Sequence, residues 1–405
     1  MTSHKLKVAL VFGTRPEAIK MAPLALALNS ESSLDTRIVV TGQHRQMLDQ
    51  VLDLFALKPD QDLNLMQHGQ SLSGLTSRAI TALEAAFAAD RPDLVLVHGD
   101  TTTTMVASLS AFYHQIPVGH VEAGLRTGDI WAPWPEEVNR QIVGRIASMH
   151  FAPTERARQN LLCEGVDDAK IFVTGNTVID ALQWVTARLE KAAEEGALEL
   201  ASLMVQNVAG ALPAPATMQA LQQIVEGDAR MVLITGHRRE NLGEGFRNIC
   251  NALNRLADDF PEVHFVYPVH LNPRVQAPVN ELLGTVKNIH LISPLDYLPF
   301  TFLMNHSTLV LTDSGGIQEE APGLGKPVLV MRDVTERPEG VDAGTVKLVG
   351  TCQDAIYDGV ARLLTDPEHY ASMAEANNPF GDGRACQRII EAISAWHKNT
   401  ERGDS

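Results

Sequence analysis

The feature that most constrains this chain is a repeated alternation of short aliphatic runs, small-residue turns and helical stretches. Residues 8–12 lead into Gly13-Thr14-Arg15-Pro16-Glu17 and a helical segment, and similar junctions follow residues 37–40, 94–97, 117–120 and 171–173. Continuous apolar runs separated by helices are typical of parallel strands that are buried on both faces. The pattern therefore predicts an α/β fold.

This alternation is interrupted between residues 181 and 226, where Ala, Leu and Glu dominate and predict a helix–loop–helix connector. It then resumes, with strands predicted at residues 231–235, 264–267, 288–292, 308–312 and 327–331. We therefore expect two Rossmann-like domains, with a ligand cleft at the carboxyl ends of their strands.

Charge and cysteine content exclude several classes of protein. The 405 residues carry 33 Lys and Arg against 49 Asp and Glu, a net charge of −16. This argues against nucleic acid or an anionic membrane as the main partner, although a phosphorylated ligand needs only a few local cations. The four cysteines form no CxxC pair, and the apolar run at residues 8–12 is too short for a signal peptide or membrane span. A cytoplasmic protein is expected.

Two segments could bind an anion. In the first, Gly13 precedes a helix start whose backbone amides point outward, Arg15 offers a fork for phosphate, and Lys20 lies one turn after Pro16. The alternative is an ordinary strand–helix turn with two solvated cations.

The second segment runs from Asp313 through Ser314, Gly315 and Gly316 to two glutamates at 319 and 320. The glycines let backbone amides approach a phosphate, and a glutamate one turn later could accept hydrogen bonds from a ribose. The alternative is a helix capped by Asp313 or Ser314, with first-turn glutamates favoured by the helix dipole.

Acidic residues follow neighbouring strands of the first predicted domain. Asp100 and Glu122 come directly after strands, and Glu136 and Glu137 follow a tryptophan–proline pair. Several carboxylates in one cleft could move protons to and from carbon. The alternatives are a helix cap for Asp100, a salt bridge from Glu122 to Arg126, and a helix start for the glutamate pair.

A compact cationic group, His237-Arg238-Arg239, follows a strand of the second predicted domain and could face a diphosphate. The alternative is a charged surface loop. HExxH, GxGxxG, GxxxxGK[ST] and GxSxG motifs are all absent from the sequence, so no metalloprotease, classical dinucleotide, P-loop or hydrolase-elbow signature is found.

Taken together, these segments resemble the bacterial non-hydrolysing UDP-N-acetylglucosamine 2-epimerases. The resemblance runs in order from about residue 7 to about residue 383, and it rests on the segments VFGTRPEAIK (11–20), VHGDT (97–101), HVEAGLRT (120–127), GNT (175–177), TGHRRE (235–240) and TDSGGIQEE (312–320).

The resemblance implies the glycosyltransferase-B type of fold, with two Rossmann-like domains facing a central cleft. It places the first domain at residues 1–177, with a C-terminal helix at 384–405 packing back on it, and a UDP-binding domain at 178–383. The connector between Asp180 and Arg230 is longer and richer in alanine than is usual for the family. Family members are typically homodimers and need neither a cofactor nor a metal.

The resemblance also assigns roles to residues. It implies catalytic roles for Lys20, Asp100, Glu122, Glu136 and His237. It implies contacts to the nucleotide sugar for Arg15, His270, Ser314, Gly315, Gly316, Glu320 and Arg337. A possible site for a second, activating substrate molecule falls near Gln43 and Gln46.

The implied reaction is the reversible conversion of UDP-GlcNAc to UDP-ManNAc, which feeds the synthesis of cell-surface polysaccharides. UDP leaves first to give a 2-acetamidoglucal, because the C2 proton is otherwise barely acidic, and then adds back. The alternatives are a glycosyltransferase of the same architecture, a hydrolysing 2-epimerase that releases ManNAc and UDP, and a non-catalytic nucleotide-sugar sensor. The sensor reading is disfavoured because the acidic residues accompany the UDP loop.

Overall fold

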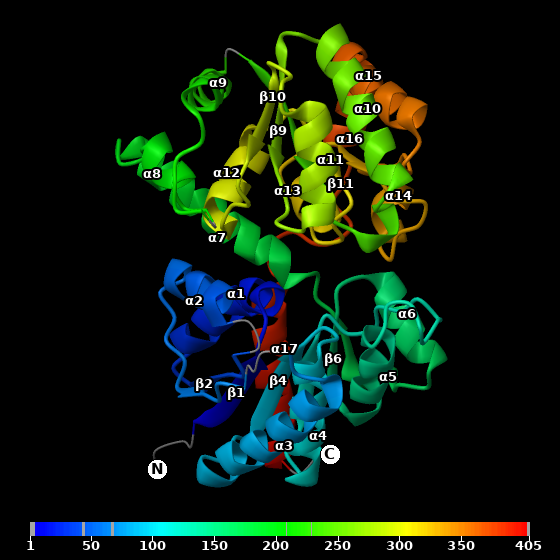
Figure 1. Ribbon diagram of the computed structural model, residues 1–405. Coiled ribbons are helices and arrows are strands. Elements are labelled where there is room, and N and C mark those ends of the chain that lie inside the picture. Colours follow the sequence, from blue (N-terminus) through cyan, green and yellow to red (C-terminus); the bar gives the residue numbers. More distant parts are fainter. Residues whose placement is uncertain (1–4, 43–44, 66–68, 208, 228, 403–405) are drawn as a thin grey trace. The chain divides into compact units, whose positions relative to one another are not determined.

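The chain folds into two compact units, which a computed structural model describes over residues 5–42, 45–65, 69–207, 209–227 and 229–402 (Figure 1). Unit 1 comprises Met1–Ala181 and Phe380–Ser405, and unit 2 comprises Leu182–Pro379. The chain therefore leaves unit 1, builds unit 2 and returns to unit 1 for its last helix.

Unit 1 is built on a seven-stranded parallel sheet of order β3-β2-β1-β4-β5-β6-β7. The strands are β1 (Leu6–Phe12), β2 (Leu34–Val40), β3 (Gln61–Asp62), β4 (Leu94–His98), β5 (Val118–Val121), β6 (Met149–Ala152) and β7 (Ile171–Val173). The helices are α1 (Arg15–Ser30), α2 (Arg45–Leu54), α3 (Leu72–Ala89), α4 (Thr102–Tyr113), α5 (Glu136–Ile146), α6 (Glu155–Cys163), η1 (Asp168–Lys170), the start of α7 (Thr177–Glu194) and α17 (Ala385–Arg402).

Unit 2 contains a six-stranded parallel sheet of order β10-β9-β8-β11-β12-β13. Its strands are β8 (Arg230–Thr235), β9 (Val263–Pro268), β10 (Ile289–Ile292), β11 (Leu309–Thr312), β12 (Val328–Val330) and β13 (Val346–Leu348). After α7, its helices are α8 (Leu200–Met204), α9 (Pro215–Val225), η2 (Arg239–Asn241), α10 (Glu244–Asp259), α11 (Pro273–Leu283), α12 (Tyr297–His306), α13 (Ile317–Gly323), α14 (Pro338–Asp342), α15 (Gln353–Thr365) and α16 (Pro367–Ala374).

The apolar runs become central strands because both faces of each sheet are covered. Every residue of β4, β5 and β11 is buried, as continuous apolar strands in parallel sheets require. In each sheet the strand order reverses once, beside β1 and β4 in unit 1 and beside β8 and β11 in unit 2. Ligands of open α/β sheets bind at the carboxyl ends of strands at such switch points.

The last helix is fastened to unit 1 near the start of α7. The carboxylate of Asp180 accepts hydrogen bonds from the backbone amides of Cys386 at 2.9 Å and Ala385 at 3.2 Å. These are amides at the start of α17, which have no partner within their own helix. The helix also packs against α1.

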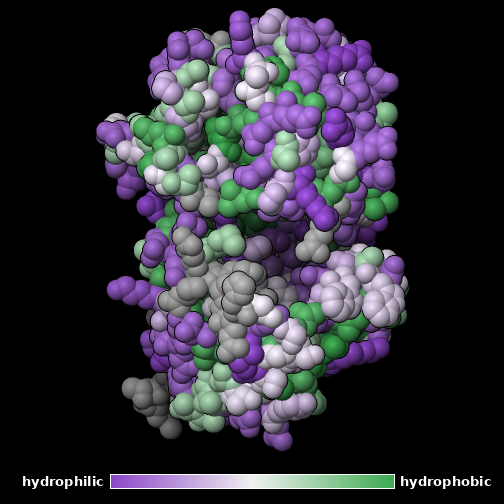
Figure 2. Space-filling view, viewed as in Figure 1, coloured by the Kyte–Doolittle hydropathy of each residue, from purple (hydrophilic) through white to green (hydrophobic). Residues whose placement is uncertain are grey.

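The predicted α/β fold with two Rossmann-like units of the glycosyltransferase-B type is confirmed. Each predicted strand overlaps an observed one, whereas β3, β6 and β13 were not predicted. The connector differs from the predicted helix–loop–helix, because the short α8 lies between α7 and α9. Hydrophilic residues dominate the face drawn in Figure 2. In the described ranges, no helix is long and apolar enough to cross a bilayer.

Candidate active site

Asp100 lies at the carboxyl end of β4, and its side chain does not cap the next helix. The cap of α4 is Thr101, whose hydroxyl accepts a hydrogen bond from the amide of Thr104 at 3.1 Å. The Asp100 carboxylate instead pairs with Arg140, whose Nη2 and Nε lie 2.6 and 3.0 Å from Oδ2. The helix-cap alternative for Asp100 is therefore wrong.

Glu122 follows β5 and is held by partners other than the one considered from sequence. Its carboxylate forms an ion pair with Lys20 and accepts a hydrogen bond from Nδ2 of Asn176 at 2.7 Å. Arg126 pairs with Glu164 instead, at 2.6 and 2.8 Å. Lys20 and Glu122 are both almost fully buried, so each neutralises a charge that would be costly alone.

Two adjacent glutamates at the start of α5 have different environments. Glu136 is half-buried and makes no side-chain hydrogen bond or ion pair within the described part of the chain. Glu137 is fully buried and accepts hydrogen bonds from Arg140 and from the amides of Thr127 and Gly128. Burial alone would raise the pKa of Glu137, but these hydrogen bonds lower it. Glu137 is thus a buried carboxylate whose hydrogen bonds are used within the fold, whereas the side chain of Glu136 has none of these bonds and could contact a ligand.

The β1–α1 turn carries the two cations that the sequence singled out. Thr14 caps α1 and exchanges hydrogen bonds with Glu17 in a capping box, and Arg15 is the first residue of the helix. Arg15 is half-buried, whereas Lys20 is buried beside Glu122. The structure therefore brings Lys20 beside Glu122, after the carboxyl end of β5.

A buried histidine also lies beside Glu122. Nε2 of His98 is 3.8 Å from a carboxylate oxygen of Glu122 and has no hydrogen-bond partner among the described residues. Burial lowers the pKa of His98 to about 4, an effect that the nearby carboxylate of Glu122 opposes. His98 is therefore neutral at pH 7.

In unit 2, Asp313 organises the loop that follows β8. It lies after β11 and is fully buried. Its Oδ2 accepts hydrogen bonds from the backbone amides of His237 and Arg238, both at 2.8 Å, and its Oδ1 lies 3.3 Å from Nδ1 of His237. The sequence placed Asp313 in a possible helix cap, but the structure shows that it positions His237.

His237 and His270 lie together, although η2, α10 and β9 separate them along the chain. Their rings stack with centroids 5.4 Å apart and an interplanar angle of 19°. Burial lowers the pKa of His270, as does the charge of His237, whereas Asp313 opposes the shift. Two imidazoles at the carboxyl ends of adjacent strands could donate hydrogen bonds to a diphosphate.

The glycine-rich loop after β11 lies against Arg337. A Cβ atom on Gly315 would lie 2.7 Å from Nη1 of Arg337, so glycine at this position lets the guanidinium lie this close to the loop. Nε of Arg337 donates to Glu319, and Oε2 of Glu320 accepts from the hydroxyl of Tyr297 at 2.9 Å. The arrangement is typical of a loop that accommodates a phosphate beside a cation.

The helix-cap alternative for this loop is wrong. The residue that precedes α13 is Gly316, which has no side chain to cap the helix. Asp313 is engaged with the His237 loop, and the amide of Ser314 donates to Oγ1 of Thr312 at 2.9 Å. The structure thus assigns the cap position of α13 to Gly316 and not to Ser314.

Other predicted features fall elsewhere. Gln43 and the side chain of Gln46 lie outside the described residues. Among the residues that the structure covers, no group of three or more His, Cys, Asp and Glu side chains could hold a metal ion.

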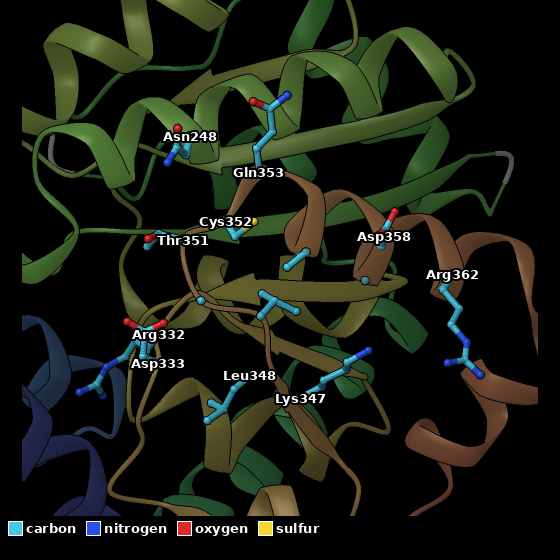
Figure 3. Close-up of a pocket in the computed structure, with 14 residues that line it drawn as sticks. Asn248, Arg332, Asp333, Lys347, Leu348, Thr351, Cys352, Gln353, Asp358 and Arg362 are labelled. Atoms are coloured by element: carbon cyan, nitrogen blue, oxygen red, sulfur yellow. The ribbon is translucent and has the colours of Figure 1, made fainter.

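A cavity of about 970 Å³ opens in unit 2 beside β13 and the start of α15 (Figure 3). It contains none of the predicted site residues. Its lining includes Arg332, Asp333, Lys347, Cys352 and Arg362.

The fold and these two groups of side chains are typical of an α/β enzyme, with hydrogen-bonded carboxylates at strand ends in unit 1 and a glycine-rich, cationic loop typical of a phosphorylated ligand in unit 2. Comparison with known proteins makes the class specific. The family model for UDP-N-acetylglucosamine 2-epimerase matches residues 26–394.

Relatives with this name cover nearly the whole chain. The UDP-N-acetylglucosamine 2-epimerases of Yersinia pestis and Escherichia coli K12 are 57% and 56% identical over 388 residues, which is 96% of this chain and 98% of each relative. A crystal structure of UDP-GlcNAc 2-epimerase from Neisseria meningitidis bound to UDP-GlcNAc is 48% identical with a TM-score of 0.85, covering 96% of this chain and 100% of that one. The chain belongs to the UDP-N-acetylglucosamine 2-epimerase family, so the predicted family and enzyme class are confirmed.

Proposed function

We propose that this chain interconverts UDP-GlcNAc and UDP-ManNAc by inverting C2 of the sugar, with UDP departing and returning. The single observation that carries the proposal is the match to the 2-epimerase family along almost the whole chain. The geometry supports it, because Asp100 and Glu122 end neighbouring strands of unit 1 and are both well supplied with hydrogen-bond donors.

The order of bond changes follows from the acidity of the carbon. The proton on C2 is not flanked by a carbonyl group, so no carboxylate could remove it directly at a useful rate. Breaking the C1–O bond to UDP develops positive charge at C1 and makes the C2 proton removable, which gives a 2-acetamidoglucal. Return of a proton to the opposite face of C2 and of UDP to C1 completes the inversion.

Unit 2 supplies the groups that stabilise departing UDP. The backbone of Ser314, Gly315 and Gly316 and the guanidinium of Arg337 suit the diphosphate, and the stacked His237 and His270 can donate to its oxygens. Glu320, one turn into α13, is our proposed ribose ligand, and Arg15 of unit 1 adds a cation for the nucleotide.

Unit 1 supplies the groups that move protons. We assign this role to Asp100, Glu122 and Glu136, with Lys20 as the counter-ion of Glu122. Inversion needs a base on one face of C2 and an acid on the other, and these three carboxyl groups could share the two roles. Glu136, which has no described partner, is the one free to turn toward a ligand.

The test is proton exchange with solvent. The protein is incubated with UDP-GlcNAc alone in D₂O, and we expect UDP-ManNAc to form with deuterium at C2 of both sugars, read by NMR and mass spectrometry. UDP-GlcNAc without protein is the control. Absence of label would point to a transferase that needs an acceptor, and label found only in free ManNAc would point to a hydrolysing epimerase.

Four further features of the proposal concern context. The product would feed cell-surface polysaccharide synthesis, and the four unpaired cysteines are in keeping with a cytoplasmic location. The homodimer and the activator site near Gln43 and Gln46 stay predictions.

A further inference from the structure

The carboxylate of Asp100 is held by one oxygen only. Both contacts from Arg140, through Nη2 and Nε, fall on Oδ2. Oδ1 receives no hydrogen bond from any described residue. The backbone is fixed as well, because Nδ2 of Asn139 donates to the carbonyl oxygen of Asp100 at 2.8 Å. One oxygen is thus fixed, and the other remains available.

Arg140 is itself fixed from its far side. Its Nη1 donates to Oε2 of Glu137 at 3.0 Å, and the Glu137 carboxylate is fully buried and bonded to the amides of Thr127 and Gly128. All three nitrogens of the guanidinium are therefore engaged, two by Asp100 and one by Glu137. A planar guanidinium group that is hydrogen-bonded on both sides cannot rotate without breaking a buried ion pair.

We propose that Arg140, anchored by Glu137, is a positioning residue that holds Asp100 by Oδ2 so that Oδ1 stays directed to the proton exchanged at C2. The proposal rests on the proposed function, in which Asp100 takes part in proton transfer. Lysine cannot replace Arg140, because a single ammonium group cannot span both carboxylates with this geometry. A shift of about 1 Å in a reacting group can lower turnover about 100-fold.

The first experiment compares two arginines of equal burial. In Arg140→Lys we expect kcat to fall about 100-fold, while KM for UDP-GlcNAc changes little. The urea midpoint should fall, because a buried carboxylate loses its partner, so kcat is measured where urea unfolding shows the variant to be folded. The matched control is Arg126→Lys. Arg126 has the same side-chain exposure as Arg140, 9%, and pairs with Glu164 at 2.6 and 2.8 Å, but contacts no proposed catalytic group. Equal kcat losses in the two variants would overturn the proposal, as would an unchanged kcat in Arg140→Lys.

The second experiment asks whether Arg140 acts through Asp100. Deuterium incorporation at C2 is followed over long incubations, so that slow variants remain measurable. We expect Asp100→Asn to lower the rate strongly and the Asp100→Asn/Arg140→Lys double variant to be no slower than Asp100→Asn. A double variant slower by the full factor of the Arg140 change contradicts the proposal. Wild-type turnover in Asp100→Asn would instead remove Asp100 from the proposed mechanism, a separate failure.

A third variant guards against a folding defect. If Arg140→Lys does not fold, Glu137→Gln replaces it, because the amide keeps the shape of the side chain and removes the charge that anchors Arg140. We expect a smaller fall in kcat than the 100-fold predicted above, with KM unchanged. A kcat equal to that of the wild type would overturn the proposal.

Discussion

Glu122 adopts a backbone conformation that non-glycine residues rarely use, with φ of +62°. Such a conformation costs on the order of 1 kcal/mol and persists only where the surroundings determine it fully. Here the side chain is tied to Lys20 and Asn176, which directs the carboxylate toward the end of the sheet. Local strain at this residue is thus balanced by contacts that also position a proposed catalytic group.

Position 13 requires a glycine because two threonine side chains lie very close to the place that a Cβ atom would take. A Cβ atom at this position would lie 1.9 Å from Oγ1 of Thr41 and 2.7 Å from Oγ1 of Thr103, two buried hydroxyls that bond each other at 2.9 Å. Gly13→Ala is therefore expected to lower the free energy of unfolding by about 2–3 kcal/mol, measured by urea denaturation.

The control for this prediction is Gly245→Ala. A Cβ atom at Gly245 would meet only Thr351, at ordinary contact distances of 3.4 Å, and the position lies inside α10. Its stability should change little or rise. If Gly13→Ala unfolds at the same urea concentration as the wild type, the β1–α1 turn can accommodate a Cβ atom at position 13 and the prediction is wrong.

At the scale of elements, three consecutive strands of unit 1 each bury a histidine. His98, His120 and His150 lie on β4, β5 and β6, and the last two are partners in register. Burial lowers their pKa values to about 4, about 3 and about 4 respectively. All three are therefore neutral in the folded protein near pH 7.

This row of histidines predicts acid sensitivity. Below pH 6.5 the unfolded chain binds protons at these positions while the folded chain does not, so stability falls as the pH falls from 6.5 toward 4. For His150 the loss between pH 8 and pH 5 is about 2 kcal/mol. Urea unfolding of His150→Phe should show a loss over this interval that is smaller by about that amount. Equal losses in the variant and the wild type would contradict the assignment.

The helices and strands can be predicted from this sequence better than the contacts between side chains. Apolar runs identify most strands, whereas the three that were missed, β3, β6 and β13, are among the shortest, with two, four and three residues. Asp100 and Glu122 were predictable because topology brings the ends of adjacent parallel strands together. The role of Arg140 could not be predicted, because its partner Asp100 lies 40 residues away in the sequence and the pairing depends on how α5 packs on α4.

At the scale of the whole molecule, unit 1 is discontinuous in sequence. Its last helix, α17, buries Ile389 and Ile393 fully. Deleting residues 380–405 should therefore cost about 3–6 kcal/mol from these two side chains alone and expose unit 1 to protease, while unit 2 keeps its own sheet.

Limited proteolysis followed by mass spectrometry checks this prediction, since fragments should come from residues 5–181. Deletion of residues 403–405 alone serves as the control. Equal protease resistance of unit 1 in the truncated and full-length proteins would show that α17 is dispensable.

The return of α17 also affects how the protein is made. During synthesis the first 181 residues emerge from the ribosome long before α17, the helix that completes their core. Residues 182–379, in contrast, emerge as one uninterrupted stretch. The unit that begins the chain is therefore the last to mature. Nascent chains that stall before residue 380 would carry an incomplete N-terminal unit, for which chaperones have the longest opportunity to bind.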